Sequence, residues 1–256
     1  MNRSLPPNLF KRGLSERRKQ PGLWLSLESP NATEVAAGAG YDWLMLDLEH
    51  STVELGQAVE HLRAARGGTA EMMVRVPWNE PVIVKRLLDA GFRTFMFPFV
   101  QNADEARRAV AATRYPPHGI RGFAGTSRAT GFGRIPGYAE ACAAEQCVVV
   151  QVETTAALAE IAAIGAVDGV DAIFIGPNDL AASMGFLARA SAPEVRAAIA
   201  GALGDIRATG KAAGILQYNV EEARALFAAG FDFIAVGSDI GILARRSEAL
   251  LSEIRA

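Results

Sequence analysis

The amino-acid sequence predicts one α/β domain with the architecture of a (β/α)8 TIM barrel, spanning residues 1–256. Three observations lead to this prediction. Eight apolar, strand-like segments alternate with helical segments, which is typical of a parallel sheet, and the count of eight favours a closed barrel over a doubly wound open sheet. The length of 256 residues matches the roughly 250 of such barrels. Polar residues follow most of the strand-like segments, at the end where parallel barrels carry their active sites.

In the first half of the sequence, four predicted strands alternate with four predicted helices. These strands are expected at residues 22–27, 43–48, 71–76 and 94–100. The helices that follow them are expected at residues 33–40, 53–65, 80–90 and 102–114, and the apolar residues of the second repeat with a period close to 3.6. Pro77 stops the third strand, Gly91 suits the end of the third helix, and Asn102 suits the start of the fourth.

The second half of the sequence repeats this rhythm after an interruption. Residues 115–136 are rich in Gly, Pro and Arg, and their lack of a clear period predicts one long loop. The later strands are expected at residues 147–153, 171–176, 212–216 and 231–236. The later helices are expected at residues 138–144, 155–164, 192–209 and 221–229, with a last helix ending near residue 254. Residues 1–20 are expected to form a basic, polar N-terminal extension.

Composition narrows the class of protein. A formal net charge of -2 gives no sign of a nucleic acid or an anionic membrane as partner. Residues 1–20 have no apolar core of a signal peptide, and no apolar run is long enough to predict a membrane span. Cys142 and Cys147 lie in no metal-ligand pattern, so we expect reduced thiols and a cytoplasmic protein.

The second predicted strand ends in residues that are suited to catalysis. Its apolar start, at residues 43–46, predicts a buried parallel strand, and Asp47, Glu49 and His50 follow at its carboxyl end. His50 is a candidate base for proton abstraction near neutral pH, and Asp47 is the candidate residue that orients it. The alternative is that His50 only caps a helix start. His61, within a predicted helix, is interpreted as a surface residue.

Other polar side chains are expected at the same mouth. Arg75 ends the third strand and offers a planar fork for an oxyanion, although a structural salt bridge at the rim is the alternative. Glu153 ends the fifth strand and Asp179 follows the sixth, and they are the candidate metal pair, because two carboxylates without Cys or His suit Mg²⁺ or Mn²⁺. Gln151 shares the strand face of Glu153 and is expected to contact the substrate or a metal-bound water.

A set of short motifs runs through the chain. They are Gly22-Leu-Trp-Leu25, Asp47-Leu-Glu-His50, Arg75-Val-Pro77, Lys85-Arg-Leu-Leu-Asp-Ala-Gly91, Val100-Gln-Asn-Ala-Asp-Glu-Ala106, Arg114-Tyr-Pro-Pro117, Gly119-Ile-Arg-Gly122, Val150-Gln-Val-Glu153, Ile175-Gly-Pro-Asn-Asp-Leu180 and Ala235-Val-Gly237. Jointly this set resembles the HpcH/HpaI family of metal-dependent pyruvate aldolases, from about residue 8 to the end. Known members of that family cleave 4-hydroxy-2-oxoheptanedioate or 2-keto-3-deoxy-glucarate.

The resemblance implies a role for each candidate side chain. It implies a divalent metal, Mg²⁺ or Mn²⁺ with Co²⁺ as a further candidate, and it implies pyruvate and an aldehyde as the reaction partners. The implied metal ligands are Glu153 and Asp179, the implied catalytic residues are His50, Asp47 and Arg75, and the implied substrate-binding residues are Arg75, Gln151, Gly176, Pro177, Asn178 and Asp89.

The resemblance also implies an assembly. Asp89 would act across a subunit interface, the last helix would be exchanged between subunits, and the oligomer would be a hexamer built as a trimer of dimers. The Gly-rich residues 122–131 and the pair Gln217-Tyr218 depart from the pattern expected of the family, and both are expected near the aldehyde.

Two other functions stay open at this stage. A CoA-ester lyase acting on malyl-CoA or citramalyl-CoA would need a basic site for the nucleotide phosphates, and the sequence has no clear one. A non-catalytic protein that binds oxoacids would not need the full set of candidate side chains. A lysine Schiff base is disfavoured, because Lys85 lies in a predicted helix and Lys211 precedes a predicted strand.

Overall fold

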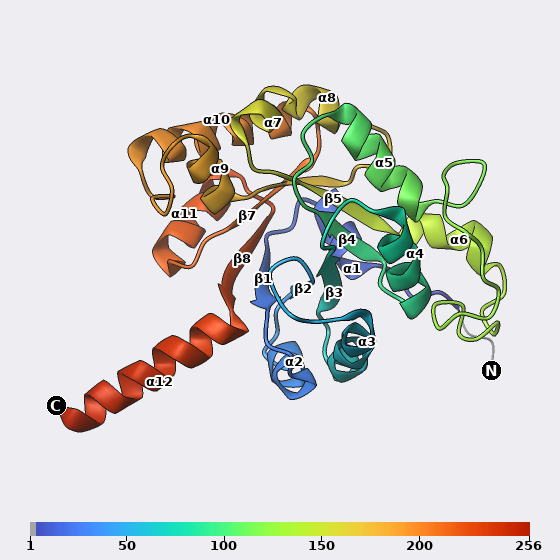
Figure 1. The fold of residues 1–256 in the computed structure, drawn as a ribbon, viewed down its shortest axis with the longest axis horizontal. Helices are drawn as coiled ribbons and strands as arrows, with labels where there is room; N and C mark the ends of the chain where they lie inside the picture. The colour runs from blue at the N-terminus through green and yellow to red at the C-terminus, as the bar shows by residue number, and fades with distance from the viewer. Residues whose placement is uncertain (1–3) are drawn as a thin grey trace.

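A computed structural model of the chain describes residues 4–256 and confirms the predicted barrel (Figure 1). Eight parallel strands pair in sequence order and β1 closes onto β8. The strands are β1 (Gln20–Leu25), β2 (Trp43–Asp47), β3 (Glu71–Arg75), β4 (Thr94–Phe97), β5 (Cys147–Val152), β6 (Ala172–Ile175), β7 (Ala212–Leu216) and β8 (Phe233–Ser238).

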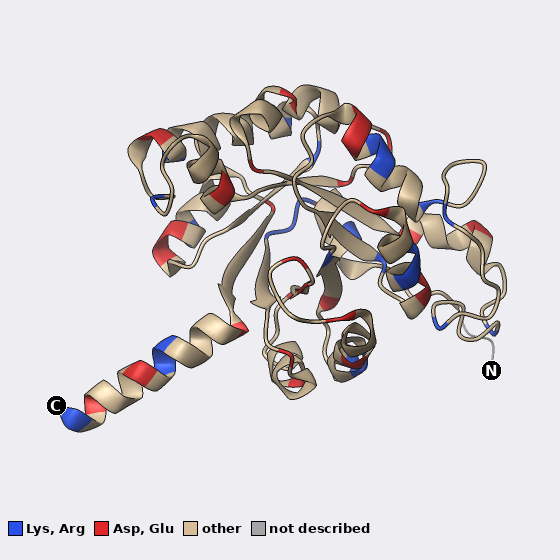
Figure 2. Cartoon of the chain, viewed as in Figure 1, with Lys and Arg blue, Asp and Glu red and all other residues tan. Residues whose placement is uncertain are grey.

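The helices lie around this barrel. They are α1 (Leu9–Ser15), α2 (Pro30–Ala37), α3 (Leu55–Ala64), α4 (Pro81–Ala90), α5 (Ala103–Thr113), α6 (Tyr138–Glu145), α7 (Thr155–Ala159), α8 (Ile161–Gly165), α9 (Pro177–Ser183), α10 (Pro193–Ala208), α11 (Val220–Ala229) and α12 (Asp239–Arg255), with a 3-10 turn at Ala65–Gly67. Figure 2 shows basic and acidic residues on the outer helices, with both signs on α12.

Alternation along each strand sorts its side chains between two apolar clusters. Inside the barrel lie Trp43, Met45, Met73 and Phe233, among others, and the other strand face packs against the surrounding helices. Helix α1 adds Phe10 to the interior cluster. Because strand side chains alternate with a period of two, the residues that continue an inward series beyond the strand end also point into the barrel mouth.

Most predicted elements are confirmed, with three corrections. Helix α1 lies inside the segment predicted as an extension, and its N-cap Asn8 accepts a hydrogen bond from the Lys11 backbone. The helix predicted at residues 155–164 is two helices, because the backbone leaves the helical region at Glu160. Helix α9 was not predicted as a helix, since it is only seven residues long.

His61 is also corrected, because it is fully buried rather than on the surface. Its Nδ1 lies 2.6 Å from the Thr33 hydroxyl, which joins α3 to α2. Burial lowers the pKa of His61, so a neutral imidazole is favoured there.

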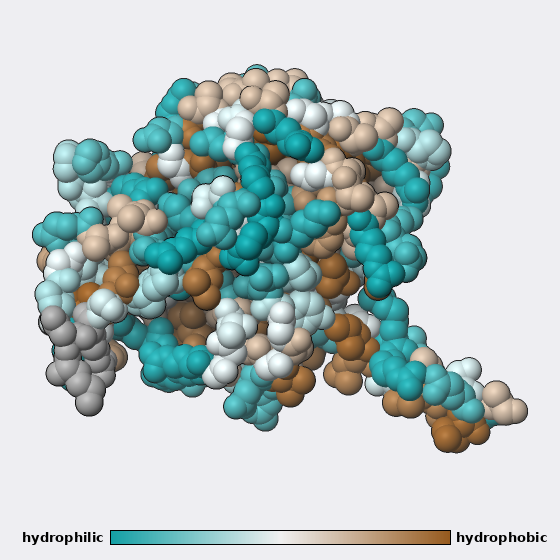
Figure 3. Space-filling view, turned by 180° about the vertical axis from the view of Figure 1, so that it is seen from behind, coloured by the Kyte–Doolittle hydropathy of each residue, from teal (hydrophilic) through white to brown (hydrophobic). Residues whose placement is uncertain are grey.

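Helix α12 projects away from the barrel (Figure 1). Its start is attached to β1, because the Asp239 carboxylate accepts hydrogen bonds from the backbone of Ser26 at 2.9 Å and Leu27 at 3.1 Å. Beyond that point none of its residues is buried. Apolar side chains are nevertheless exposed along it: Ile240, Ile242, Leu243, Leu250, Leu251 and Ile254. Figure 3 shows this apolar surface on the projecting helix.

None of the helices among residues 4–256 has the length and apolar character needed to cross a membrane.

Candidate active site

Asp47 and Arg75 form the centre of the barrel mouth. They are register partners at the carboxyl ends of β2 and β3, and each lies two residues after an interior methionine. Arg75 donates to Asp47 twice, from Nε at 2.9 Å and from Nη2 at 2.6 Å. The remaining guanidinium nitrogen, Nη1, lies 2.8 Å from Oε2 of Glu49. Such a charge-assisted fork fixes both side chains.

Asp47 gathers further donors. The Trp24 indole N–H donates to it at 3.0 Å, and the backbone N–H groups of Glu49 and His50 donate to it at 3.0 and 3.3 Å. Burial alone would raise the pKa of Asp47, but the hydrogen bonds and charge of Arg75, with the other donors, lower it below the ordinary value. Asp47 is therefore held as a buried carboxylate.

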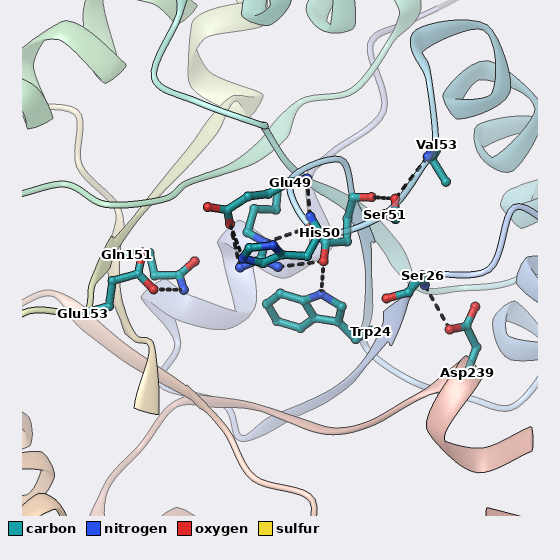
Figure 4. Close-up of polar contacts among 11 residues, drawn as sticks. Trp24, Ser26, Glu49, His50, Ser51, Val53, Gln151, Glu153 and Asp239 are labelled. Carbon is teal, nitrogen blue, oxygen red and sulfur yellow. Dashed lines mark hydrogen bonds and ion pairs between the residues drawn. The ribbon is translucent and has the colours of Figure 1, made fainter. Parts of the chain in front are cut away.

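The His50 ring lies at the exposed edge of the site, with two-thirds of its side chain accessible (66%). Asp47 contacts the backbone of His50 and makes no hydrogen bond to its imidazole ring. The carboxylate beside the ring is Glu49, whose Oε2 is 3.9 Å from His50 Nε2 (Figure 4). Burial raises the pKa of Glu49 against the lowering effect of Arg75. The carboxylate beside the imidazole is therefore Glu49, two residues after Asp47, which the sequence predicted for this position.

Glu153 is buried at the end of β5 and both of its oxygens are engaged. Oε1 accepts from the Phe99 backbone N–H at 2.8 Å, and Oε2 accepts from the Gln151 amide at 2.5 Å (Figure 4). Burial is the largest cause that raises the pKa of Glu153 to about 7, and the charges of Asp179 and Glu49 add to it. Such a carboxyl group is protonated in a large fraction of molecules at neutral pH, and a bound cation would displace that proton.

The end of β6 closes the site from the other side. Gly176 is the N-cap of α9, Pro177 is its first residue, and Asp179 lies in its first turn. A Cβ at position 176 would lie 2.3 Å from Glu153 Oε2 and 2.8 Å from Gln151 Nε2. Only glycine therefore lets the backbone approach these side chains so closely.

A cavity of about 250 Å³ joins most of the predicted site residues. Its lining includes Asp47, His50, Arg75, Gln151, Gly176, Pro177, Asn178 and Asp179. Glu153 lies behind Gln151, to which it is hydrogen bonded. The sequence thus predicted, from separate strand ends, a set of residues that the fold gathers at one mouth.

Asp89 does not join this mouth within the chain. It lies at the end of α4 that leads into the start of β4, so it is at the amino end of the barrel. Its carboxylate accepts a hydrogen bond at 2.8 Å from Arg121, a residue of the long loop whose side chain is fully buried. A role of Asp89 across a subunit interface remains a prediction.

The residues at the mouth fit a hard divalent metal. Glu153 and Asp179 would supply oxygen ligands, and a dication would offset both the burial of Glu153, which is the main cause of its raised pKa, and its repulsion from Asp179. Gln151 Oε1 is buried without a hydrogen-bond partner and is available to a water or a ligand. Among residues 4–256 no group of three or more His, Cys, Asp or Glu side chains is placed to hold a metal ion, so a metal held by Glu153 and Asp179 would take its other ligands from water or substrate.

Sequence reasoning missed several residues of the site. Trp24 was part of an apolar strand and looked like core, yet it donates to Asp47 and lines the cavity. Ser26 and Ser238 also line the cavity, where their small polar side chains gave no motif. The Phe99 backbone donor carries no side-chain signal at all, so only the fold reveals it.

A closed parallel barrel with Arg75 and buried carboxylates at its carboxyl mouth defines an enzyme of the (β/α)8 class. The chain belongs to the HpcH/HpaI aldolase/citrate lyase family, whose sequence model matches residues 20–245.

Two similar proteins and one solved structure support this assignment. A "Pyruvate aldolase" of Rhizobium etli is 47% identical over 246 residues, covering 96% of this chain and 97% of that protein. A "4-hydroxy-2-oxo-heptane-1,7-dioate aldolase" of Salmonella dublin is 47% identical over 250 residues, covering 97% and 95%. The crystal structure of an HpcH/HpaI aldolase/citrate lyase family protein from Burkholderia cenocepacia J2315 superposes with a TM-score of 0.94 at 41% identity, covering 97% of this chain and all of that one (100%).

Proposed function

We propose that the chain is a divalent-metal-dependent pyruvate aldolase, which cleaves a 4-hydroxy-2-oxo acid to pyruvate and an aldehyde. One observation carries the proposal: Arg75, Asp179 and an exposed imidazole line one small cavity, and Glu153, a carboxyl group with a pKa of about 7, lies behind the lining residue Gln151. In this arrangement the Arg75 guanidinium can donate hydrogen bonds to a keto oxygen, and the His50 imidazole at the open edge can accept a proton. The similar proteins named as aldolases support the same reaction.

The cleavage needs a proton acceptor and a place for the released electron pair. His50 takes the proton of the C4 hydroxyl, the C3–C4 bond breaks, and the aldehyde leaves. The electron pair of that bond passes to C3 and the C2 carbonyl, which becomes an enolate, and protonation at C3 gives pyruvate. Arg75 stabilises the negative oxygen, because its N–H groups not used by Asp47 and Glu49 remain donors.

Glu153 and Asp179 would hold the metal, which supplies Lewis acidity at the keto oxygen when bound. Mg²⁺ and Mn²⁺ suit this oxygen-rich site, and Co²⁺ is a further candidate. Gln151 orients Glu153 through its amide N–H and offers its free Oε1 to a water or to pyruvate. The backbone around Gly176, Pro177 and Asn178 is proposed to receive the pyruvate carboxylate, since it begins a helix.

The assembly is part of the proposal. The exposed apolar side chains of α12 lose contact with water when the helix packs on a second subunit, which supports an exchanged helix. We propose a hexamer built as a trimer of dimers, in which Asp89 of one subunit adds to a neighbouring site. Buried, unpaired Cys142 and Cys147 support a cytoplasmic location.

A CoA-ester lyase is the competing activity, because the family description also includes citrate lyase. The cavity of about 250 Å³ is below the roughly 300–1,000 Å³ of common ligand sites. A pyruvate-sized group fits this cavity, whereas a CoA ester would have to extend into the adjoining cavity of about 800 Å³, which shares Pro177, Asn178, Leu216 and Tyr218 with it. Simple oxoacid binding without catalysis would leave His50 without a role.

The test offers candidate substrates to the purified protein with Mg²⁺ or Mn²⁺ and couples released pyruvate to lactate dehydrogenase. We expect 4-hydroxy-2-oxo acids to release pyruvate, and EDTA to abolish the release until metal is restored. Malyl-CoA and citramalyl-CoA, followed by thiol release and product analysis, serve as the competing substrates. Cleavage of a CoA ester without cleavage of any hydroxy-oxo acid would reject the proposal.

A further inference from the structure

Phe99 has an unusual backbone conformation beside the proposed metal site. Its φ angle is +50°, in the left-handed region, which is unfavourable for a residue with a side chain. This conformation directs its N–H to Glu153 Oε1, at 2.8 Å. Strained residues of this kind persist only where their surroundings over-determine them.

The neighbouring residues supply those constraints. The next N–H, of Val100, donates to the backbone carbonyl of Gln151 at 3.1 Å, which docks the turn on β5. The Gln101 side chain spans the turn: its amide donates to the Phe99 carbonyl at 3.3 Å, and its oxygen accepts from the Thr154 hydroxyl at 2.6 Å. These contacts tie the turn to the strand that carries Glu153.

An aromatic stack holds the turn from outside. The rings of Phe99 and Trp78 are 6.0 Å apart and inclined by 29°, although more than half of Trp78 is exposed to solvent. Trp78 follows β3 by three residues, so this stack links the ends of β3 and β4. A large exposed aromatic residue is thus placed where it restrains Phe99.

We propose that Phe99 is a positioning residue, whose left-handed backbone holds Glu153 in the orientation needed for a metal ligand, with Gln101 and Trp78 as its supports. The proposal rests on the function given above. Fixing Oε1 by the Phe99 N–H and Oε2 by the Gln151 amide confines the carboxylate to one rotamer. The metal then binds without first ordering this side chain, which favours affinity.

Two substitutions at position 99 distinguish the contribution of the backbone N–H from that of the aromatic ring. Phe99→Gly keeps the N–H and adopts a positive φ without strain, whereas Phe99→Pro removes the N–H and fixes φ near −65°. We measure the Mn²⁺ dissociation constant of the full chain by electron paramagnetic resonance, with circular dichroism as the folding control. We expect a change of less than about threefold for Phe99→Gly and a rise of at least about tenfold for Phe99→Pro.

Folded Phe99→Pro protein with wild-type Mn²⁺ affinity would overturn the proposal, and so would equal losses in the two variants. If Phe99→Pro does not fold, Gln101→Ala provides the test. We expect the Mn²⁺ dissociation constant of Gln101→Ala to rise at least threefold, and an unchanged value overturns the inference. Trp78→Ala should weaken Mn²⁺ binding, because Phe99, unlike a glycine, needs the stack to stay at a positive φ, and Trp78→Phe should restore the affinity. An unchanged affinity in Trp78→Ala overturns the role of Trp78. Wild-type protein that binds no Mn²⁺ rejects the metal assignment itself, which is a separate outcome.

Discussion

Arg75 and Asp47 face each other across neighbouring strands and share two hydrogen bonds, of 2.9 and 2.6 Å. Both side chains are buried, so neither charge is compensated by bulk water. Because Asp47 also receives the Trp24 indole N–H, the pair forms the rigid floor of the cavity. Substitution of either residue should therefore affect both the activity and the stability of the protein.

Arg75→Lys removes the planar fork but keeps a positive charge. We expect pyruvate formation to fall by at least about 100-fold, since oxyanion donors are commonly worth 10²–10³ in rate. Arg75→Ala should also destabilise the fold by about 3–5 kcal/mol, because it leaves a buried Asp47 unpaired. Activity assays and urea denaturation measure the two effects. The control is Arg93→Lys, since Arg93 pairs with Glu71 at the opposite end of the barrel. Equal activity losses in both lysine variants would refute the role of Arg75.

His50→Ala should abolish most of the cleavage activity while leaving the fold and metal affinity intact. General acid–base groups contribute about 10²–10⁴ in rate, so we expect a loss in that range. Its ring is largely exposed, so its removal creates no cavity. His118→Ala, in the long loop, is the matched control and should retain full activity. A His50→Ala enzyme as fast as wild type would move the base to another group.

The raised pKa of Glu153 should make both the stability of the fold and metal binding depend on pH. Its pKa in the folded chain is about 7, above the ordinary 4.5, so the folded state holds this proton more tightly than the unfolded state. The resulting stability is full below pH 4.5 and is lost as pH rises towards 7. Metal-free Glu153→Gln should therefore be more stable than wild type at pH 8, by up to about 3 kcal/mol, and no more stable at pH 4.

Metal binding should displace that same proton below pH 7. Calorimetric titration with Mn²⁺ in two buffers of different ionisation enthalpy counts the protons released. We expect close to one proton at pH 6 and few at pH 8. Binding at pH 6 without proton release would show that the carboxyl group is already ionised.

Gly176→Ala should disrupt the site although it adds a single methyl group. The new Cβ would meet Glu153 Oε2 at 2.3 Å and Gln151 Nε2 at 2.8 Å, so these side chains or the backbone must move. We expect at least a tenfold loss in Mn²⁺ affinity, measured by electron paramagnetic resonance. Gly201→Ala is the control, because a Cβ there meets no atom within 4 Å in α10 and suits a helix. An unaltered affinity in Gly176→Ala would contradict the geometry.

Helix α12 should determine the oligomeric state. Replacing Leu243 and Leu250 by Glu puts charge on its exposed apolar surface and should shift the protein to smaller species in light scattering. Ser252→Glu, on the same helix, adds charge without removing an apolar side chain and should leave the mass unchanged. A wild-type monomer, or a doubly substituted protein of unchanged mass, would refute the exchanged helix.

Much of the fold was predictable because its signals are local. Apolar strand segments, helix-ending glycines such as Gly91 and the N-cap Asn102 act within a few residues, and the structure confirms both of these caps. Helix α1 was not predicted, because its apolar residues Phe10 and Leu14 are separated by basic side chains. The two residues are buried only because they pack against the barrel interior. His61 was misplaced because nothing local reveals its buried partner Thr33.

The site was predictable at the level of residues but not of contacts. Period-two alternation places Asp47, Gln151 and Glu153 at the mouth, and the cavity confirms this for Asp47 and Gln151. Which carboxylate lies beside the His50 ring depends on the backbone after β2, where Asp47 is used by Arg75 and by two backbone donors. Such pairings are set by tertiary packing, so the sequence alone does not specify them.

We propose that this site converts pyruvate to its enolate with the help of a divalent metal. Proton NMR of pyruvate in deuterated water tests it without knowledge of the aldehyde. With Mg²⁺ present, we predict loss of the methyl signal as deuterium enters C3. EDTA should stop the loss, and added metal should restore it. A wild-type protein that leaves the methyl signal unchanged with Mg²⁺, Mn²⁺ and Co²⁺ would contradict the account.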